Sequence, residues 1–259
     1  MRVAYDTCDI AFMLHRDFHH GLRAIAMSDI QIAAPAGSLQ VRALWQASNQ
    51  VVLICHPHPL FGGTMDNKVV TTLARFFKNQ NISVVTFNFR GVGSSTGQHA
   101  NGVGEIDDAL AVLDWIMQQS PVQQQADMQS SPQSDIHNSA QNNAKPLQLY
   151  LAGFSFGAYI AAAVASRFNQ QQINAELAAF KLLKTFLVAP PVHHYPMQDL
   201  SLASDTVVLM GEVDEVVPPD EVIAWASQLD LQLVMMPNCS HFFHGHLPEL
   251  CQQLALYFP

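Results

Sequence analysis

The sequence predicts an α/β fold with one mainly parallel, eight-stranded sheet and helices on both faces. Buried-strand runs of apolar and β-branched residues alternate with segments of helical periodicity, which is typical of strand–helix–strand units. Two short alternating segments precede the first buried run and predict an antiparallel start to the sheet. Of the 259 residues, 49% are hydrophobic, which is enough apolar surface for one core.

Each element follows from its local pattern. The predicted strands span 29–33, 39–46, 51–55, 82–89, 147–152, 182–189, 206–211 and 231–236. The predicted helices span roughly 66–79, 104–118, 156–168, 219–229 and 246–257. In a parallel sheet the loops that follow the strands emerge at one edge, where ligands bind, so the chemistry is expected in these loops.

Two segments do not fit this alternation. Residues 1–26 have little periodicity, and we interpret them as a loose N-terminal extension or as the result of a misassigned start, with Met27 as the true first residue. Residues 119–146 are dominated by Gln, Ser, Asn and Pro, which predicts a solvated or disordered insert. The folded domain is therefore predicted at 27–259.

Composition excludes several classes of function. With 12 basic and 21 acidic side chains the net charge is −9, which argues against nucleic acid as a partner. The longest uncharged stretch, 146–166, is interrupted by glycines and a serine, so no membrane span or membrane partner is predicted. Four cysteines without CxxC spacing, and no signal peptide, predict reduced thiols in a cytoplasmic protein. The oligomeric state stays open.

The most specific motif is Gly153-Phe154-Ser155-Phe156-Gly157, between a predicted strand and a predicted helix. This context predicts a nucleophile elbow, a sharp turn that lifts the serine Oγ above the sheet. Small residues on either side of Ser155 let strand and helix approach each other. The N–H of Phe156, at the helix start, is then expected to stabilise an oxyanion.

A nucleophilic serine needs a histidine as base and an acid that orients the histidine. After a nucleophile elbow, the acid comes next along the chain and the histidine follows it. Asp214 comes just after the strand 206–211 and is the predicted acid, with Glu212 and Glu215 as competing neighbours. His241 follows the strand 231–236 and is the predicted base. His244 is the runner-up, and His246 lies close by.

A second oxyanion donor is expected from the loop after the strand 51–55, which reads HPHPLFGG. Such a loop can hold a backbone N–H toward the serine. We predict Leu60 as this donor, with His58 and Phe61 as alternatives.

Other kinds of site are weaker interpretations. His56 and His58, together with the trio His241, His244 and His246, suggest zinc, but no carboxylate accompanies them at ligand spacing, so no metal and no cofactor are predicted. The turn at 90–97 lacks the third glycine of a dinucleotide-binding motif. The acids that open the next helix suit its dipole and receive no catalytic role: Glu105, Asp107 and Asp108.

Taken together, these blocks resemble a bacterial subgroup of the α/β-hydrolase superfamily. The blocks are HPHPLFGGTMDNKVV, FNFRGVGSSTG, GEIDDALAVLDW, LAGFSFGAY, GEVDEVVPP and SHFFHG, and the resemblance covers roughly 28–259. It implies a small, single-domain α/β-hydrolase fold without a cap domain. It also implies Ser155 as nucleophile, His241 as base and Asp214 as acid.

The expected function is therefore that of a serine hydrolase that cleaves small carboxylic esters through an acyl-enzyme. The expected partner is a small-molecule ester. Two alternatives remain: a peptidase or acyltransferase that uses the same three residues, and a non-catalytic binding protein that retains the fold.

Overall fold

The computed structural model describes residues 29–119, 145–170 and 177–258. The predicted extension at 1–26 lies outside these residues, as does the predicted insert except for its ends at 119, 145 and 146. Within the described chain, the sheet has eight strands in the order β1-β2-β4-β3-β5-β6-β7-β8. The predicted fold class is confirmed.

Every predicted strand is present, and its ends differ from the predicted ones by at most two residues. The strands are β1 (Asp29–Ala34), β2 (Gly37–Leu44), β3 (Gln50–Cys55), β4 (Ser83–Phe87), β5 (Leu147–Phe154), β6 (Phe180–Val188), β7 (Val207–Gly211) and β8 (Gln232–Met236). β2 pairs antiparallel with β1 and β4, and all other neighbours are parallel. β3 and β4 are buried along almost their whole length, because helices cover both faces of the sheet.

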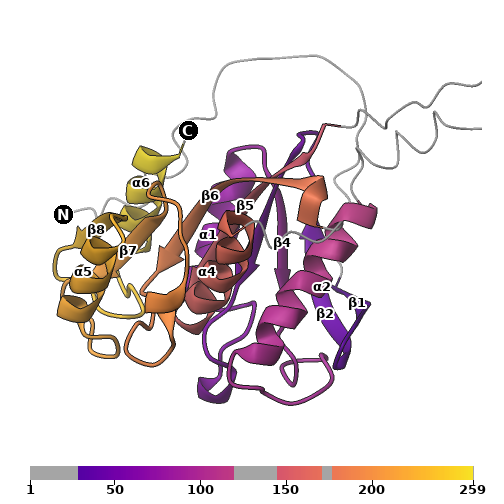
Figure 1. Ribbon diagram of the computed structural model, residues 1–259, viewed down its shortest axis with the longest axis horizontal. Coiled ribbons are helices and arrows are strands. Elements are labelled where there is room, and N and C mark those ends of the chain that lie inside the picture. The colour runs from indigo at the N-terminus through magenta and orange to yellow at the C-terminus, as the bar shows by residue number, and fades with distance from the viewer. Residues whose placement is uncertain (1–28, 120–144, 171–176, 259) are drawn as a thin grey trace, which may run out of the picture.

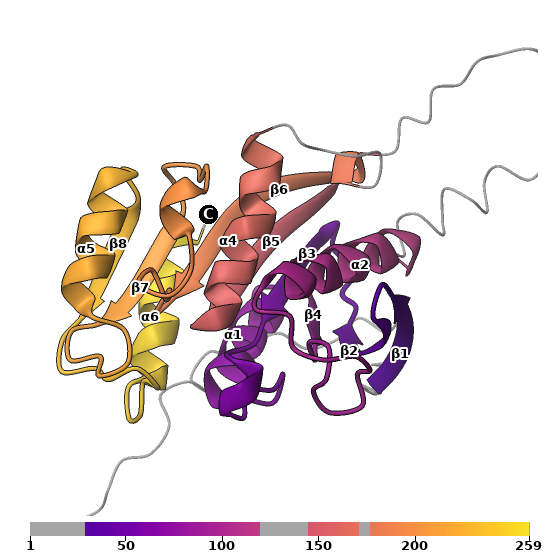
Figure 2. The same ribbon diagram turned by 60° about the horizontal axis from the view of Figure 1, so that its bottom comes forward.

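The five predicted helices are also present. They are α1 (Lys68–Asn79), α2 (Val103–Gln119), α4 (Phe156–Asn169), α5 (Pro219–Gln228) and α6 (Leu247–Tyr257). Three short 3₁₀ turns accompany them in the described chain: η1 (Pro59–Phe61), η2 (Leu177–Ala179) and η3 (Met197–Asp199). α1 and α6 pack together on one face of the sheet, whereas α2, α4 and α5 cover the other (Figures 1 and 2).

Local chemistry explains where helices begin. The Asn67 side chain accepts a hydrogen bond from the N–H of Val69 at 2.9 Å and so caps α1. Proline occupies the first helical position of α5, where a missing N–H costs nothing. Across the three described ranges, every helix is too short or too polar to cross a bilayer.

The connection between β6 and β7 contains only the turn η3 among its described residues. A cap domain would need longer helices at this place, so the predicted absence of a cap holds here.

Candidate active site

Ser155 occupies a strained turn between β5 and α4. Its backbone angles are φ 53° and ψ −121°, a conformation that costs a non-glycine residue about 1–3 kcal/mol. The strand β6 holds the turn in place, because the Ser155 N–H donates to the carbonyl of Val188 at 2.8 Å. This is the geometry of a nucleophile elbow.

The flanking glycines are required by close backbone contacts. A Cβ on Gly153 would lie 2.1 Å from the carbonyl oxygen of Gly157, and a Cβ on Gly157 would lie 2.2 Å from that of Cys55. Real Cβ atoms do not come this close to backbone atoms. The glycines therefore let β3, β5 and α4 meet directly beneath Ser155.

Three residues from three loops form one hydrogen-bonded chain. His241 Nε2 lies 3.1 Å from Ser155 Oγ, and His241 Nδ1 lies 2.8 Å from Asp214 Oδ2. The side chains of His241 and Asp214 are almost fully buried, whereas Ser155 is partly accessible. In this arrangement the imidazole is placed where it can take the hydroxyl proton, and the carboxylate is placed where it can fix the tautomer of the imidazole.

The backbone of its own loop holds Asp214 in position. Its Oδ1 accepts hydrogen bonds from the N–H groups of Val216 and Val217 at 2.8 and 2.7 Å.

Burial, and then the neighbouring Asp214 charge, raise the pKa of the Cys239 thiol to about 11. The Cys239 thiol is therefore protonated at neutral pH, and it is a poor alternative to Ser155 as a nucleophile.

The competing residues from the sequence occupy other positions. Glu212 accepts a hydrogen bond from the Asn238 N–H, and Glu215 accepts one from the backbone N–H of His241, each at 3.2 Å. His244 is exposed and stacks on Phe242. None of these three side chains has a recorded contact with the Ser155 hydroxyl in the described chain.

In the loop after β3, the backbone N–H of Leu60, which was expected to be the second oxyanion donor, is occupied by another hydrogen bond. The Leu60 N–H donates to Nδ1 of His58 at 3.2 Å, and the Phe61 N–H donates to the His58 carbonyl at 3.1 Å. Of the three residues considered as second oxyanion donor, only His58 has a backbone N–H without a recorded partner among the described residues. The His58 ring lies against the Phe156 ring, with centroids 5.0 Å apart.

The histidines that suggested zinc have other contacts in the fold. His56 is fully buried, where its Nε2 accepts the Phe89 N–H at 3.0 Å. Burial lowers the pKa of His56 to about 4, despite an opposing contact of its Nδ1 with the Pro57 carbonyl. Over the described ranges, no three His, Cys, Asp or Glu side chains are grouped so that they could hold a metal ion.

The sequence interpretation missed a second buried carboxylate–imidazole pair near this site. Glu105 Oε1 lies 2.9 Å from His99 Nδ1, and the His99 ring lies 4.8 Å from the His58 ring between centroids. The sequence signal is an acid at the start of α2 after a glycine-rich loop, which a favourable interaction with the helix dipole explains equally well. Asp108, the next acid on the same side of α2, pairs with Arg90.

Exposed apolar side chains flank the site on three loops. The loop after β3 contributes two, and the loops around Asp214 and His241 contribute three more; they are Leu60, Phe61, Val213, Val216 and Phe242. Phe61 is the most exposed, at 87%. We call these five residues the apolar rim.

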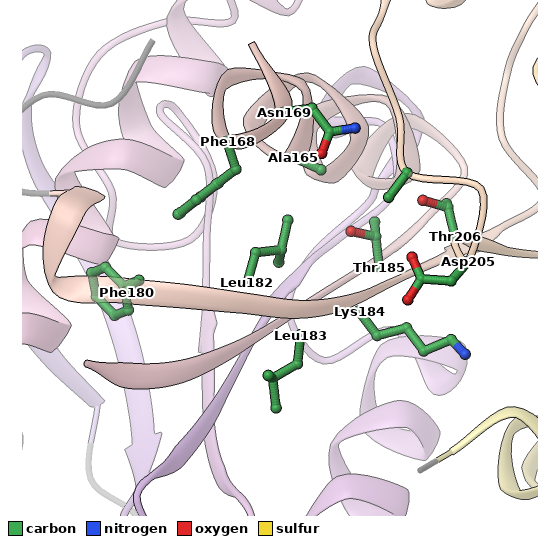
Figure 3. A pocket seen from close by; sticks show the side chains of 11 residues that line it. Ala165, Phe168, Asn169, Phe180, Leu182, Leu183, Lys184, Thr185, Asp205 and Thr206 are labelled. Carbon is green, nitrogen blue, oxygen red and sulfur yellow. The ribbon is translucent and has the colours of Figure 1, made fainter. Parts of the chain in front are cut away.

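The cavity in Figure 3 belongs to the opposite edge of the sheet. It has a volume of about 340 Å³ and is lined by the amino-terminal half of β6, the last turn of α4 and the residues just before β7. Ser155 lies at the carboxyl end of β5, so this cavity is separate from the hydrogen-bonded chain described above.

This fold and this elbow define an α/β hydrolase, and the comparisons with known proteins agree. Residues 103–247 match the family model for the alpha/beta hydrolase fold. The chain is also 32% identical over 244 residues to an uncharacterized protein of Rickettsia prowazekii, covering 89% of this chain and 88% of that one. The chain therefore belongs to the α/β hydrolase family.

Solved structures place it more closely within that family. It is similar to an alpha-beta serine hydrolase homologue from Coxiella burnetii, with 38% identity, a TM-score of 0.71, and 90% and 97% of the two chains covered. It is also similar to a serine hydrolase without lid from Xanthomonas campestris, with 31% identity, a TM-score of 0.70, and 92% and 96% covered.

Proposed function

We propose that this protein is a serine hydrolase that cleaves small carboxylic esters. The observation that carries the proposal is the chain of contacts from Ser155 Oγ through His241 to Asp214, built on a strained elbow. The similarity to serine hydrolases from Coxiella burnetii and Xanthomonas campestris supports the same class of reaction.

In the proposed reaction, Ser155 Oγ attacks the acyl carbon while His241 Nε2 takes the hydroxyl proton. The C–O bond to the alcohol then breaks, the alcohol leaves with the proton from His241, and an acyl-enzyme remains. Water attacks the acyl-enzyme, His241 takes its proton, and the acid is released as the proton returns to Ser155. Asp214 stabilises the imidazolium and keeps the proton on Nδ1.

Two backbone N–H groups are proposed to stabilise the oxyanion. The first belongs to Phe156, the first residue of α4, whose N–H has no partner within the helix. For the second we propose His58 in place of Leu60, because the N–H groups of Leu60 and Phe61 already have acceptors.

The proposal includes the setting of the enzyme. A small-molecule ester is its partner, rather than nucleic acid or a membrane, and its location is the cytoplasm. The acidic composition and the buried, unpaired thiols of Cys55 and Cys239 support this setting.

A fluorophosphonate probe combined with p-nitrophenyl acetate tests the proposal. The wild-type protein should be labelled and should hydrolyse the ester, and Ser155→Ala should lose labelling together with about 10⁴-fold or more of kcat. Ser94→Ala is the matched control, because the Ser94 hydroxyl accepts a hydrogen bond from Gln31 on β1, away from the elbow, and the variant should keep full activity.

Labelling that persists in Ser155→Ala would refute the assignment of Ser155 as the nucleophile. Turnover of amides, or acyl transfer to an added alcohol in preference to water, would point to the peptidase or acyltransferase alternative.

A further inference from the structure

Glu105 is a buried carboxylate that organises the loop before α2. Its side chain is completely inaccessible; Oε1 accepts the Ala100 N–H and Oε2 accepts the Gly102 N–H, both at 2.8 Å. His99 Nδ1 lies 2.9 Å from Oε1, within ion-pair distance but without the geometry of a hydrogen bond. A buried carboxylate is costly unless donors satisfy it, so the two backbone hydrogen bonds fix Glu105 and the chain segment next to His99.

His99 in turn lies against the two residues that are proposed to donate their backbone N–H groups to the oxyanion, His58 and Phe156. Its side chain is only 9% exposed. The His99 ring is 4.8 Å from the His58 ring and 5.6 Å from the Phe156 ring, and those two rings are 5.0 Å apart between centroids. The three rings therefore form one packed cluster.

A hydrogen bond from the Leu60 backbone also holds the His58 ring. Its Nδ1 accepts the Leu60 N–H, which requires an unprotonated nitrogen at that position. Burial lowers the pKa of His58, and the neighbouring His99 and His194 lower it further, while Glu105 opposes them. The neutral form that accepts this bond is thereby favoured at neutral pH.

We propose that Glu105 and His99 are positioning residues of the oxyanion hole. Glu105 fixes the backbone next to His99 through its bonds to Ala100 and Gly102, and the His99 ring, placed by that backbone, packs on His58 and Phe156 and keeps their N–H groups directed above Ser155. This inference rests on the proposed function. Oxyanion stabilisation depends on donors held in place before the reaction, so a small displacement of either N–H should raise the barrier without changing how the substrate first binds.

The test compares Glu105→Gln and His99→Ala with His99→Phe. The first change would turn an amide N–H toward backbone donors, and the second would remove the ring. Both should therefore lower kcat for p-nitrophenyl acetate by about 10- to 100-fold, with KM within about threefold. His99→Phe keeps the ring contact and should recover most of the kcat. The inhibition constant of a boronic acid, which forms a tetrahedral adduct on the serine, should rise in parallel with the loss of kcat/KM.

Asp108→Asn is the matched control. Asp108 is also a fully buried carboxylate on α2, and it binds the Arg90 N–H and guanidinium, but in the described chain no histidine links it to the cluster. This variant should lose thermal stability and keep the kcat of the wild type.

Three outcomes would overturn the inference. In the first, Glu105→Gln and His99→Ala keep kcat within about twofold of the wild type, and in the second, the control Asp108→Asn loses as much kcat as these two variants. In the third, Glu105→Gln and His99→Ala raise KM and leave kcat unchanged. If Glu105→Gln does not fold, the two His99 variants decide. The rate of fluorophosphonate labelling gives a separate readout: wild-type labelling without ester turnover would contradict the esterase proposal alone, and equal labelling rates in wild type and His99→Ala would contradict the positioning role alone.

Discussion

His241 Nε2 lies 3.1 Å from Ser155 Oγ, although 86 residues separate them in the chain. The contact exists because β5 and β8 both end at the carboxyl edge of the same parallel sheet. The loop after β8 reaches back over β6 and β7, and the buried Phe243 anchors it against Phe154, with ring centroids 6.3 Å apart. The two residues are thus brought together by the order of the strands.

Replacing His241 should remove the base. His241→Ala should lower kcat to about the level of Ser155→Ala. The two residues act as a unit, so removing either one removes nearly all of the rate enhancement that they provide together. His244→Ala should keep most of the activity, since the His244 ring is exposed and stacked on Phe242. Steady-state hydrolysis of p-nitrophenyl acetate measures both. Inactivation by His244→Ala with activity retained in His241→Ala would transfer the role of base to His244.

Asp214→Asn should impair catalysis while keeping the loop intact. The amide oxygen can still accept from Val216 and Val217, but the amide nitrogen cannot accept from His241 Nδ1. The wrong tautomer is then favoured, and kcat should fall by about 10³- to 10⁴-fold with little change in thermal stability. Glu212→Gln serves as the control and should retain activity. A comparable loss in Glu212→Gln, with Asp214→Asn active, would reassign the acid.

His56 should make folding stability depend on pH. Its pKa is lowered from 6.5 to about 4, first by burial, and protonating Nε2 would also break the bond from the Phe89 N–H. Between these two values the unfolded chain binds more protons than the folded one, so the free energy of unfolding should decrease as the pH falls from about 6.5 to about 4. The full effect is about 3 kcal/mol.

Urea unfolding at several pH values across this window measures the effect. His56→Gln keeps a hydrogen-bond acceptor without a titratable ring, so its stability should change less with pH than that of the wild type. His244→Gln, at an exposed position, should keep the wild-type slope. An unchanged slope in His56→Gln would show that other groups cause the acid sensitivity.

Short-chain esters should be the preferred substrates. The apolar rim is exposed and belongs to loops rather than to a cap domain, so it leaves much of a long acyl chain in water, and each methylene left uncovered forfeits roughly 0.8 kcal/mol of binding. We expect kcat/KM for p-nitrophenyl esters to peak at about two to six acyl carbons and to fall for longer chains. No increase in rate is expected when the substrate forms micelles, because no lid has to open. A preference for long chains with a jump in rate at that point would contradict this open site.

Much of the fold could be read from the sequence because its signals are local. Each buried strand is a short apolar run, each helix has its own periodicity, and the order of these elements defines a parallel sheet. The turn at Ser155 is equally local, since strand, glycine, serine, glycine and helix lie within a few residues. The strand ends were less exact: β4 ends at Phe87 rather than at residue 89, because the next groups bond to side chains instead of a strand, the Asn88 carbonyl to the Ser95 hydroxyl and the Phe89 N–H to the His56 ring.

The tertiary structure decided the choices among similar neighbours. Three acids follow β7 and three histidines follow β8. The sequence favours His241 by its distance from the strand end, but it leaves Glu212 and Glu215 as competitors of Asp214. In the fold, Asp214 is the acid in contact with His241 Nδ1, because two backbone N–H groups of its own loop orient it.

The same limit applies to the backbone donors and to the cluster beside them. The N–H of Leu60 was an open choice in the sequence, but a hydrogen bond to the His58 ring occupies it. The contact of Glu105 with His99, and of His99 with His58, joins the loop before α2 to the loop after β3. The sequence by itself determined the elements and the elbow, because neighbouring residues set them. Only the folded chain decided which side chains meet, because contacts between distant segments depend on packing that no local pattern contains.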